Sequence, residues 1–111
     1  MERLQHALNY SRKMTFKRVD RKAFVYLIGC HDFVKVGITD DLTIRLSSLQ
    51  VGCPYELKLI TSWLVSQSGE SERRLHALWK RYEVRGEWFM LPAGELAAAM
   101  NCREFEDLFK Q

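Results

Sequence analysis

The sequence predicts an α+β fold: a small three-stranded, mainly antiparallel sheet flanked by helices, in the order β-β-α-β-α-α. Segments rich in β-branched and aromatic residues alternate with segments whose leucines recur at helical spacing. No repeat and no linker rich in Pro, Gly or Ser divides the 111 residues, and 47% of them are hydrophobic beside 28% charged. We therefore expect one globular domain.

The first two strands are expected to form a hairpin. Residues 24–28 read FVYLI, residues 33–38 read FVKVGI, and residues 29–32 between them are typical of a tight connection. A helix of about two turns should follow, because leucines recur at helical spacing after Asp40 and Asp41, either of which can cap it; these are Leu42, Leu46 and Leu49.

The second half of the chain predicts one more strand and three helical segments. Residues 57–65 are rich in β-formers. An amphipathic helix should begin near Gly69 or Glu70, since apolar side chains share one face at Leu75, Leu78, Trp79 and Tyr82. Residues 94–100 read as helical, and Asn101 with Glu104 resembles a capping box for a last helix that ends near Phe109.

Positive charge is concentrated at the N-terminus. Residues 1–22 contain seven Lys or Arg against two acids, a net +5 in a chain whose total is +3. We expect a basic arm over residues 1–22 and the folded domain over residues 23–111. The arm suits either a phosphate backbone or solvent; the cations concerned are Arg12, Lys13, Lys17, Arg18, Arg21 and Lys22.

Other features point to an intracellular setting. No apolar run approaches the roughly 20 residues that cross a bilayer, and residues 1–22 lack the apolar stretch of a secretory signal. Cys30, Cys53 and Cys102 are odd in number and widely spaced, which favours reduced structural thiols over a zinc site. A cytoplasmic location is the expectation.

Several motifs together resemble the GIY-YIG nuclease superfamily. The strand with Tyr26 is similar to the GIY strand, and Lys35-Val36-Gly37 is similar to the YIG strand, with Lys35 in place of the tyrosine. Arg45 follows Lys35 by ten positions, where family members carry an arginine on the first helix. The run from Glu72 to His76 and the later segment RGEWF resemble short domains of this kind from bacteria and their phages.

This resemblance implies a nuclease that cuts DNA with Mg²⁺ or Mn²⁺, and it makes Glu72 the metal ligand. Glu72 precedes Leu75 by three positions and Trp79 by seven, so it shares the apolar face of its helix. A carboxylate there needs a partner, and one or two carboxylates suffice for Mg²⁺. The alternative is an acid in the first turn, favoured by the helix dipole.

The remaining catalytic candidates are Tyr26, Lys35, Arg45 and His76. A guanidinium such as that of Arg45 suits a phosphate, although it is also common on surfaces. Tyr26 can activate or orient water, and Lys35 can assist it, contact phosphate or activate water itself. His76 lies one turn after Glu72 and can orient it, touch substrate or make a structural bond; Glu87 can pin a basic side chain.

Two other functions stay open. The chain can be a catalytically weak or inactive nucleic-acid-binding module on the same fold, an alternative that Lys35 supports, or a protein-interaction module, which the modest net charge supports. The nucleic acid is DNA or, alternatively, RNA. Because single modules bury only about 600–1,000 Å² of surface, specificity can require a homodimer or a partner protein.

Overall fold

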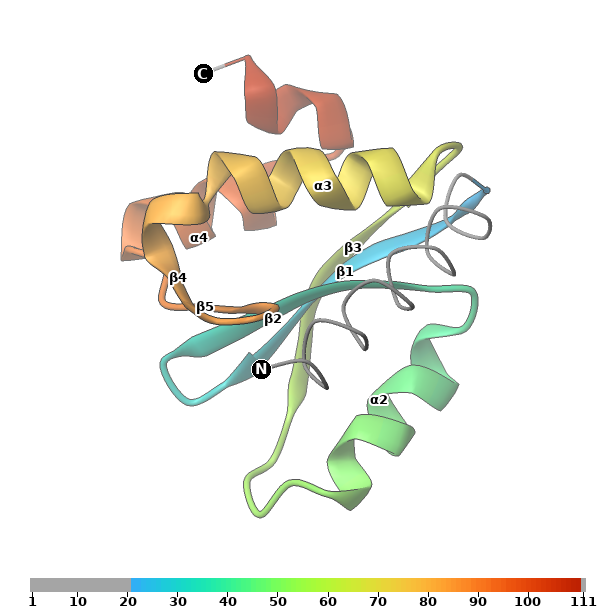
Figure 1. Ribbon diagram of the computed structural model, residues 1–111, viewed down its shortest axis with the longest axis vertical. Coiled ribbons are helices and arrows are strands. Elements are labelled where there is room, and N and C mark those ends of the chain that lie inside the picture. The colour runs from blue at the N-terminus through green and yellow to red at the C-terminus, as the bar shows by residue number, and fades with distance from the viewer. Residues whose placement is uncertain (1–20, 111) are drawn as a thin grey trace, which may run out of the picture.

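The computed structural model describes residues 21–110, which form a five-stranded antiparallel sheet with helices on both faces (Figure 1). The sheet order is β3-β1-β2-β5-β4, with bounds β1 Ala23–Cys30, β2 Phe33–Thr39, β3 Lys58–Val65, β4 Glu83–Arg85 and β5 Trp88–Phe89. The helices are α2 Leu42–Val51, α3 Ser68–Leu78 and α4 Ala93–Asn101, with 3-10 helices η1 Lys80–Tyr82 and η2 Phe105–Phe109. The α+β class is confirmed, but the sheet has five strands instead of three.

The sequence of β1 is apolar throughout because β1 is an inner strand covered on both faces of the sheet. Val25 and Leu27 join the larger core cluster, which contains Leu75 and Trp79 from the α3 side. Tyr26 and Ile28 alternate to the opposite face and pack against the leucines of α2, namely Leu42, Leu46 and Leu49. The sheet therefore separates an α2 face from an α3/α4 face.

The hairpin and the first helix are built as the sequence predicts. Cys30 pairs with Phe33, so the connection is only His31-Asp32, and His31 adopts a left-handed φ of 54°. Asp41 caps α2 by accepting a hydrogen bond from the backbone N–H of Ile44 at 2.9 Å. These local interactions fix α2 beside the end of β2.

α3 begins at Ser68, one or two residues earlier than expected, and ends at Leu78. The expected continuation through Tyr82 is wrong, because the chain tightens into η1 after the fully buried Trp79. Trp79 packs in the core, and its backbone N–H donates to the carbonyl of Leu75. The apolar side chains therefore keep their helical spacing beyond the last residue of the α-helix. α3 crosses the sheet with one face turned toward β1 and β2 (Figure 1).

The sequence missed the strands β4 and β5, which have three and two residues and are too short to show an alternating pattern. The expected start of the last helix is wrong, although η2 ends at Phe109 as expected. Asn101 ends α4 instead of capping a new helix, the chain extends through Cys102, and η2 alone precedes the C-terminus. The indole N–H of Trp63 donates to the carbonyl of Cys102 at 3.0 Å and holds this extended link.

Within residues 21–110, every helix is too short or too polar to cross a bilayer.

Candidate functional site

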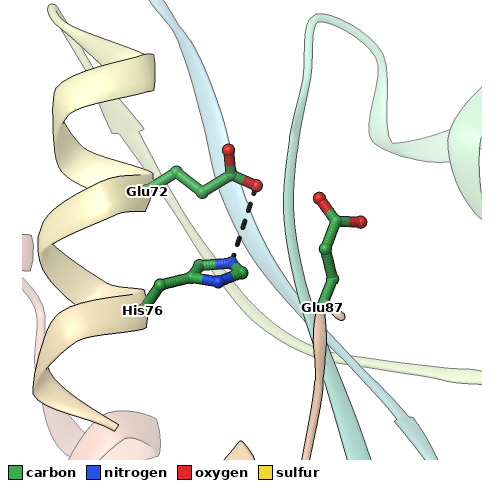
Figure 2. A group of neighbouring side chains, drawn as sticks. All are labelled: Glu72, His76 and Glu87. Carbon is green, nitrogen blue, oxygen red and sulfur yellow. Dashed lines mark ion pairs between the residues drawn. The ribbon is translucent and has the colours of Figure 1, made fainter. Parts of the chain in front are cut away.

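α3 carries Glu72 and His76 one turn apart on the face directed toward the sheet (Figure 2). Oε2 of Glu72 lies 3.8 Å from Nε2 of His76. Their side chains are only 17% and 26% exposed, because the neighbouring Leu75 is fully buried and pulls this face inward. The expectation that Glu72 shares the apolar face is confirmed. It lies in the second turn of α3, beyond the first-turn acid Glu70, so the dipole explanation fits Glu70 better.

Glu87 approaches the same point from the sheet edge (Figure 2). Its backbone carbonyl accepts a hydrogen bond from the N–H of Val36 at 2.9 Å, which ties it to β2. Gly86, at φ +55°, turns the chain just before it, a conformation that favours glycine. One ligand atom from each of Glu72, His76 and Glu87 lies within 4.8 Å of the other two.

The electrostatics of this group make a cation favourable. Burial first, and the adjacent Glu87 second, raise the pKa of Glu72 to about 7, against the opposing effects of Lys35 and Arg73. Two carboxylates that share a poorly solvated site repel each other unless a proton or a cation lies between them. Because metal ligands must be deprotonated, a bound cation would replace the proton held by Glu72.

His76 presents a nitrogen suited to the same role. Burial lowers its pKa, although a hydrogen bond to the backbone of Val36 opposes the shift. In the described part of the chain, Nε2 of His76 is buried and has no hydrogen-bond partner. The bond to Val36 is therefore made through Nδ1, and a proton there leaves the lone pair of Nε2 directed at Glu72.

Lys35 is held against this group from β2. Its Nζ donates to Oε1 of Glu87 at 2.7 Å, and its side chain is only 14% exposed. The expectation that Glu87 pins a basic side chain is thus confirmed, and Lys35 is the partner. Its Nζ also lies 5.6 Å from the ring centroid of Trp88. The position where the resemblance expects a tyrosine is occupied by a cation fixed between a carboxylate and an indole.

Tyr26 lies on the α2 face of the sheet, opposite Gly37 in the hairpin register. A Cβ at position 37 would overlap the hydroxyl and ring of Tyr26, so the glycine makes room for this side chain. Burial raises the pKa of Tyr26 to about 12, although Arg45 opposes the shift. Lys35 is not among its causes, so the idea that Lys35 lowers this pKa has no support here. A phenol that stays protonated acts as a donor.

Arg45 projects from α2 at the rim of the site. It is exposed, makes no ion pair with any residue between 21 and 110, and lines a hollow of about 400 Å³ with Ile38, Thr39 and Ser48. Its charge is close enough to Tyr26 to affect the pKa of that hydroxyl. The guanidinium is thus available to an anion beside Tyr26.

The structure describes two of the cations in the basic arm, Arg21 and Lys22. Arg21 forms an exposed ion pair with Asp40, with 2.9 Å between Nη2 and Oδ2, and Lys22 is exposed. The remaining cations predicted to bind nucleic acid lie outside the described residues; they are Arg12, Lys13, Lys17 and Arg18.

The structure brings Glu72, His76 and Lys35 together, with Tyr26 and Arg45 at one side. Glu87 is the member that sequence reasoning left out of the site. Its signal was the segment RGEWF, in which a left-handed glycine precedes the acid and an aromatic pair follows. Only the pairing of β5 with β2 carries that acid toward α3.

Comparison with known proteins gives one match. The family model of the T5orf172 domain, a phage-associated nuclease-like domain, matches residues 23–104. No curated protein and no solved structure matches.

Proposed function

This chain belongs to the T5orf172 domain family, and we propose that it is a divalent-metal-dependent endonuclease that hydrolyses phosphodiester bonds in DNA. The observation that carries the proposal is the convergence of Glu72, His76 and Glu87 from two separate elements. The nuclease-like family and the motifs that resemble the GIY-YIG superfamily both favour phosphodiester chemistry for such a group.

The donor set fits Mg²⁺ or Mn²⁺. Two carboxylates offer the oxygen ligands that both ions accept, and the unpartnered Nε2 of His76 adds a nitrogen that Mn²⁺ accepts more readily than Mg²⁺. Glu72 would be the principal ligand, because Glu87 already shares one oxygen with Lys35. Such an ion supplies Lewis-acid polarisation of the phosphate and a bound water of lowered pKa.

The other side chains have roles set by their protonation and position. Arg45 would bind a non-bridging phosphate oxygen, since a planar and permanently charged guanidinium matches that geometry. Tyr26, whose hydroxyl stays protonated, would donate a hydrogen bond to the attacking water or to the phosphate rather than accept a proton. Lys35 would keep Glu87 in place and offset the charge of the two carboxylates.

One observation supports a second function. The 2.7 Å contact between Nζ of Lys35 and Glu87 supplies, within the chain, a cation to one of the carboxylates. If Lys35 takes the place of the metal there, the chain is a nucleic-acid-binding module with weak or absent catalysis.

Nicking of supercoiled plasmid tests the two functions. Purified protein should nick in the presence of Mg²⁺ or Mn²⁺, with Mn²⁺ effective at lower concentration, and EDTA should abolish nicking. Glu72→Gln keeps the size of the side chain but removes its charge, so the rate should fall by orders of magnitude. Binding to DNA in EDTA should stay level or tighten, because a carboxylate repels phosphate when no cation lies between them.

Glu70→Gln is the matched control, since Glu70 lies two residues earlier on α3 with a 53% exposed side chain paired to Arg73. It should nick at the wild-type rate. Equal nicking by wild type and Glu72→Gln at saturating metal would remove Glu72 from the mechanism. Salt-sensitive DNA binding without any nicking by the wild type would identify the binding module instead.

A further inference from the structure

A small apolar pocket opens at the sheet edge formed by β5 and β4. It has a volume of about 240 Å³ and is lined by Cys30, Phe33, Val84, Arg85 and Trp88; we call it the Trp88 pocket. Its volume lies below the roughly 300–1,000 Å³ of pockets for drug-sized ligands, so it suits one ring system. Of these five residues, only Trp88 also contacts the candidate nuclease site, through Lys35.

The strand register places the pocket beside the candidate site. Cys30 pairs with Phe33, Lys35 pairs with Trp88, and Trp88 pairs with Arg85. Paired residues project to the same side of a sheet, as do residues two apart in one strand such as Phe33 and Lys35. The pocket thus shares the α2 face with Tyr26. Lys35 links the pocket to the candidate site, since its Nζ lies 2.7 Å from Oε1 of Glu87 and 5.6 Å from the ring centroid of Trp88.

The lining combines aromatic rings with a cation. Trp63 and Trp79 are 4% and 0% exposed, whereas Trp88 and Phe33 are half-buried. Val84 is 54% exposed and adds apolar surface to the wall of the pocket. Arg85 is exposed and makes no ion pair with any residue between 21 and 110.

We propose that the Trp88 pocket takes an unpaired nucleobase that neighbours the scissile phosphate, with Arg85 on the phosphate of the same nucleotide. A nucleotide combines a flat ring, which can stack on Trp88 and Phe33, with a phosphate anion, which can pair with Arg85. A paired base inside a duplex has both faces stacked and cannot enter. The proposal rests on the proposed function and narrows its substrate to DNA with unpaired nucleotides, such as a bubble, gap or frayed end.

Binding in EDTA tests the pocket without any cleavage. The full chain is titrated into two fluorescein-labelled DNAs of equal length and charge, one fully paired and one with three central mismatched pairs. Fluorescence anisotropy gives the two dissociation constants. Trp88→Leu should weaken binding to the mismatched DNA about 5- to 150-fold, the range for loss of one base–aromatic stack, and change duplex binding less than twofold. Trp88→Phe, which keeps a ring, should recover most of the loss.

Tyr55→Leu is the matched control, because Tyr55 is an exposed aromatic outside the pocket. It should bind both DNAs as the wild type does. Arg85→Gln should reduce the salt dependence of binding to the mismatched DNA by about 0.7 in log–log slope, the loss of one single-strand phosphate contact. Unchanged binding of the mismatched DNA by Trp88→Leu, or an equal loss on both DNAs, would overturn the proposal.

A second readout does not depend on how the leucine variant folds. Since Trp63 and Trp79 are buried, quenching of the wild-type tryptophan emission by a short oligothymidylate reports on Trp88. Saturable quenching is expected, and its absence at concentrations that bind the protein would overturn the proposal. These readouts are independent of nicking: an inactive protein that shows both effects would contradict the nuclease and leave the pocket standing.

Discussion

We expect ionised Glu72 to destabilise the fold at the position where it serves the proposed function. Its side chain is 17% exposed, and a neighbouring carboxylate adds repulsion to the loss of hydration. A residue placed only for stability would not be ionisable on this face of α3, where Leu75 and Trp79 are fully buried. Functional sites commonly carry such local costs.

The pH dependence of stability tests this conflict in metal-free protein. In the unfolded chain Glu72 ionises near its reference pKa of 4.5, whereas in the fold it holds its proton up to about 7. The unfolded state therefore binds fewer protons between these values, and the free energy of unfolding should fall as pH rises from 4.5 to 7. Glu72→Gln should remove this dependence and be more stable than wild type at pH 8, by on the order of 3 kcal/mol, with little difference at pH 4.

Urea unfolding in EDTA at several pH values measures this effect. Mn²⁺ at pH 8 should stabilise the wild type and not the variant, because a metal that binds only the folded state adds to its stability. A Glu72→Gln protein that is less stable than wild type at pH 8 would show that the carboxylate contributes favourably to the fold.

Among the elements, the β1–β2 hairpin and α3 each position a different part of the candidate site. α3 fixes Glu72 and His76 by helical spacing, and the hairpin fixes Tyr26 against Gly37 by register. Because both strands are inside the sheet, neither can shift to admit a larger residue at position 37. The strand pair therefore sets the position of the Tyr26 hydroxyl.

Gly37→Ala tests this dependence. The added methyl group would overlap the ring and hydroxyl of Tyr26, so we expect a stability loss of about 1–3 kcal/mol, as for overpacking. The nicking rate should fall by about 10²–10³, the loss typical of one misplaced hydrogen-bond donor, because the hydroxyl of Tyr26 is displaced. Gly94→Ala is the control, because a Cβ at that position in α4 meets nothing within 4 Å. Thermal unfolding and plasmid nicking are the measurements, and wild-type nicking by Gly37→Ala would contradict the proposed donor role.

At the scale of the whole molecule, the positive charge lies mainly outside the described domain. Residues 1–20 contain five Lys or Arg and two acids, a net +3, so the remaining chain is formally neutral. An approach to DNA that is driven by charge should then depend on this segment. Arg21 is best retained in a truncated chain, because it pairs with Asp40 and its carbonyl accepts the N–H of Ser68.

Deletion of residues 1–20 should weaken DNA binding and flatten its salt dependence. Each lost phosphate contact reduces the slope of log K against log salt by about 0.9, so several lost contacts would reduce it by several units. Urea unfolding should show that the fold survives. An unchanged salt slope, measured by anisotropy between 50 and 200 mM salt, would mean that the basic arm lies in solvent.

The central hairpin, α2, β3 and α3 could be predicted from the residues alone, because each is long enough for its apolar period to be seen. That Glu72 and His76 share a face could be predicted in the same way, since positions four apart on a helix always do. The resemblance to nucleases rested on the joint spacing of motifs on the hairpin, α2 and α3 and on the segment RGEWF, and the T5orf172 match agrees with it.

The place of Glu87 in the group, and its pairing with Lys35, became visible only once the chain was folded. β4 and β5 are too short for their sequence to show an alternating pattern, and they are defined by pairing, β5 with β2 and β4 with β5. The contact between Lys35 and Glu87 spans 52 positions, a separation at which no local pattern constrains geometry. The raised pKa of Glu72 also comes from contacts between distant segments, because these contacts decide how deeply a residue is buried and which charges lie beside it.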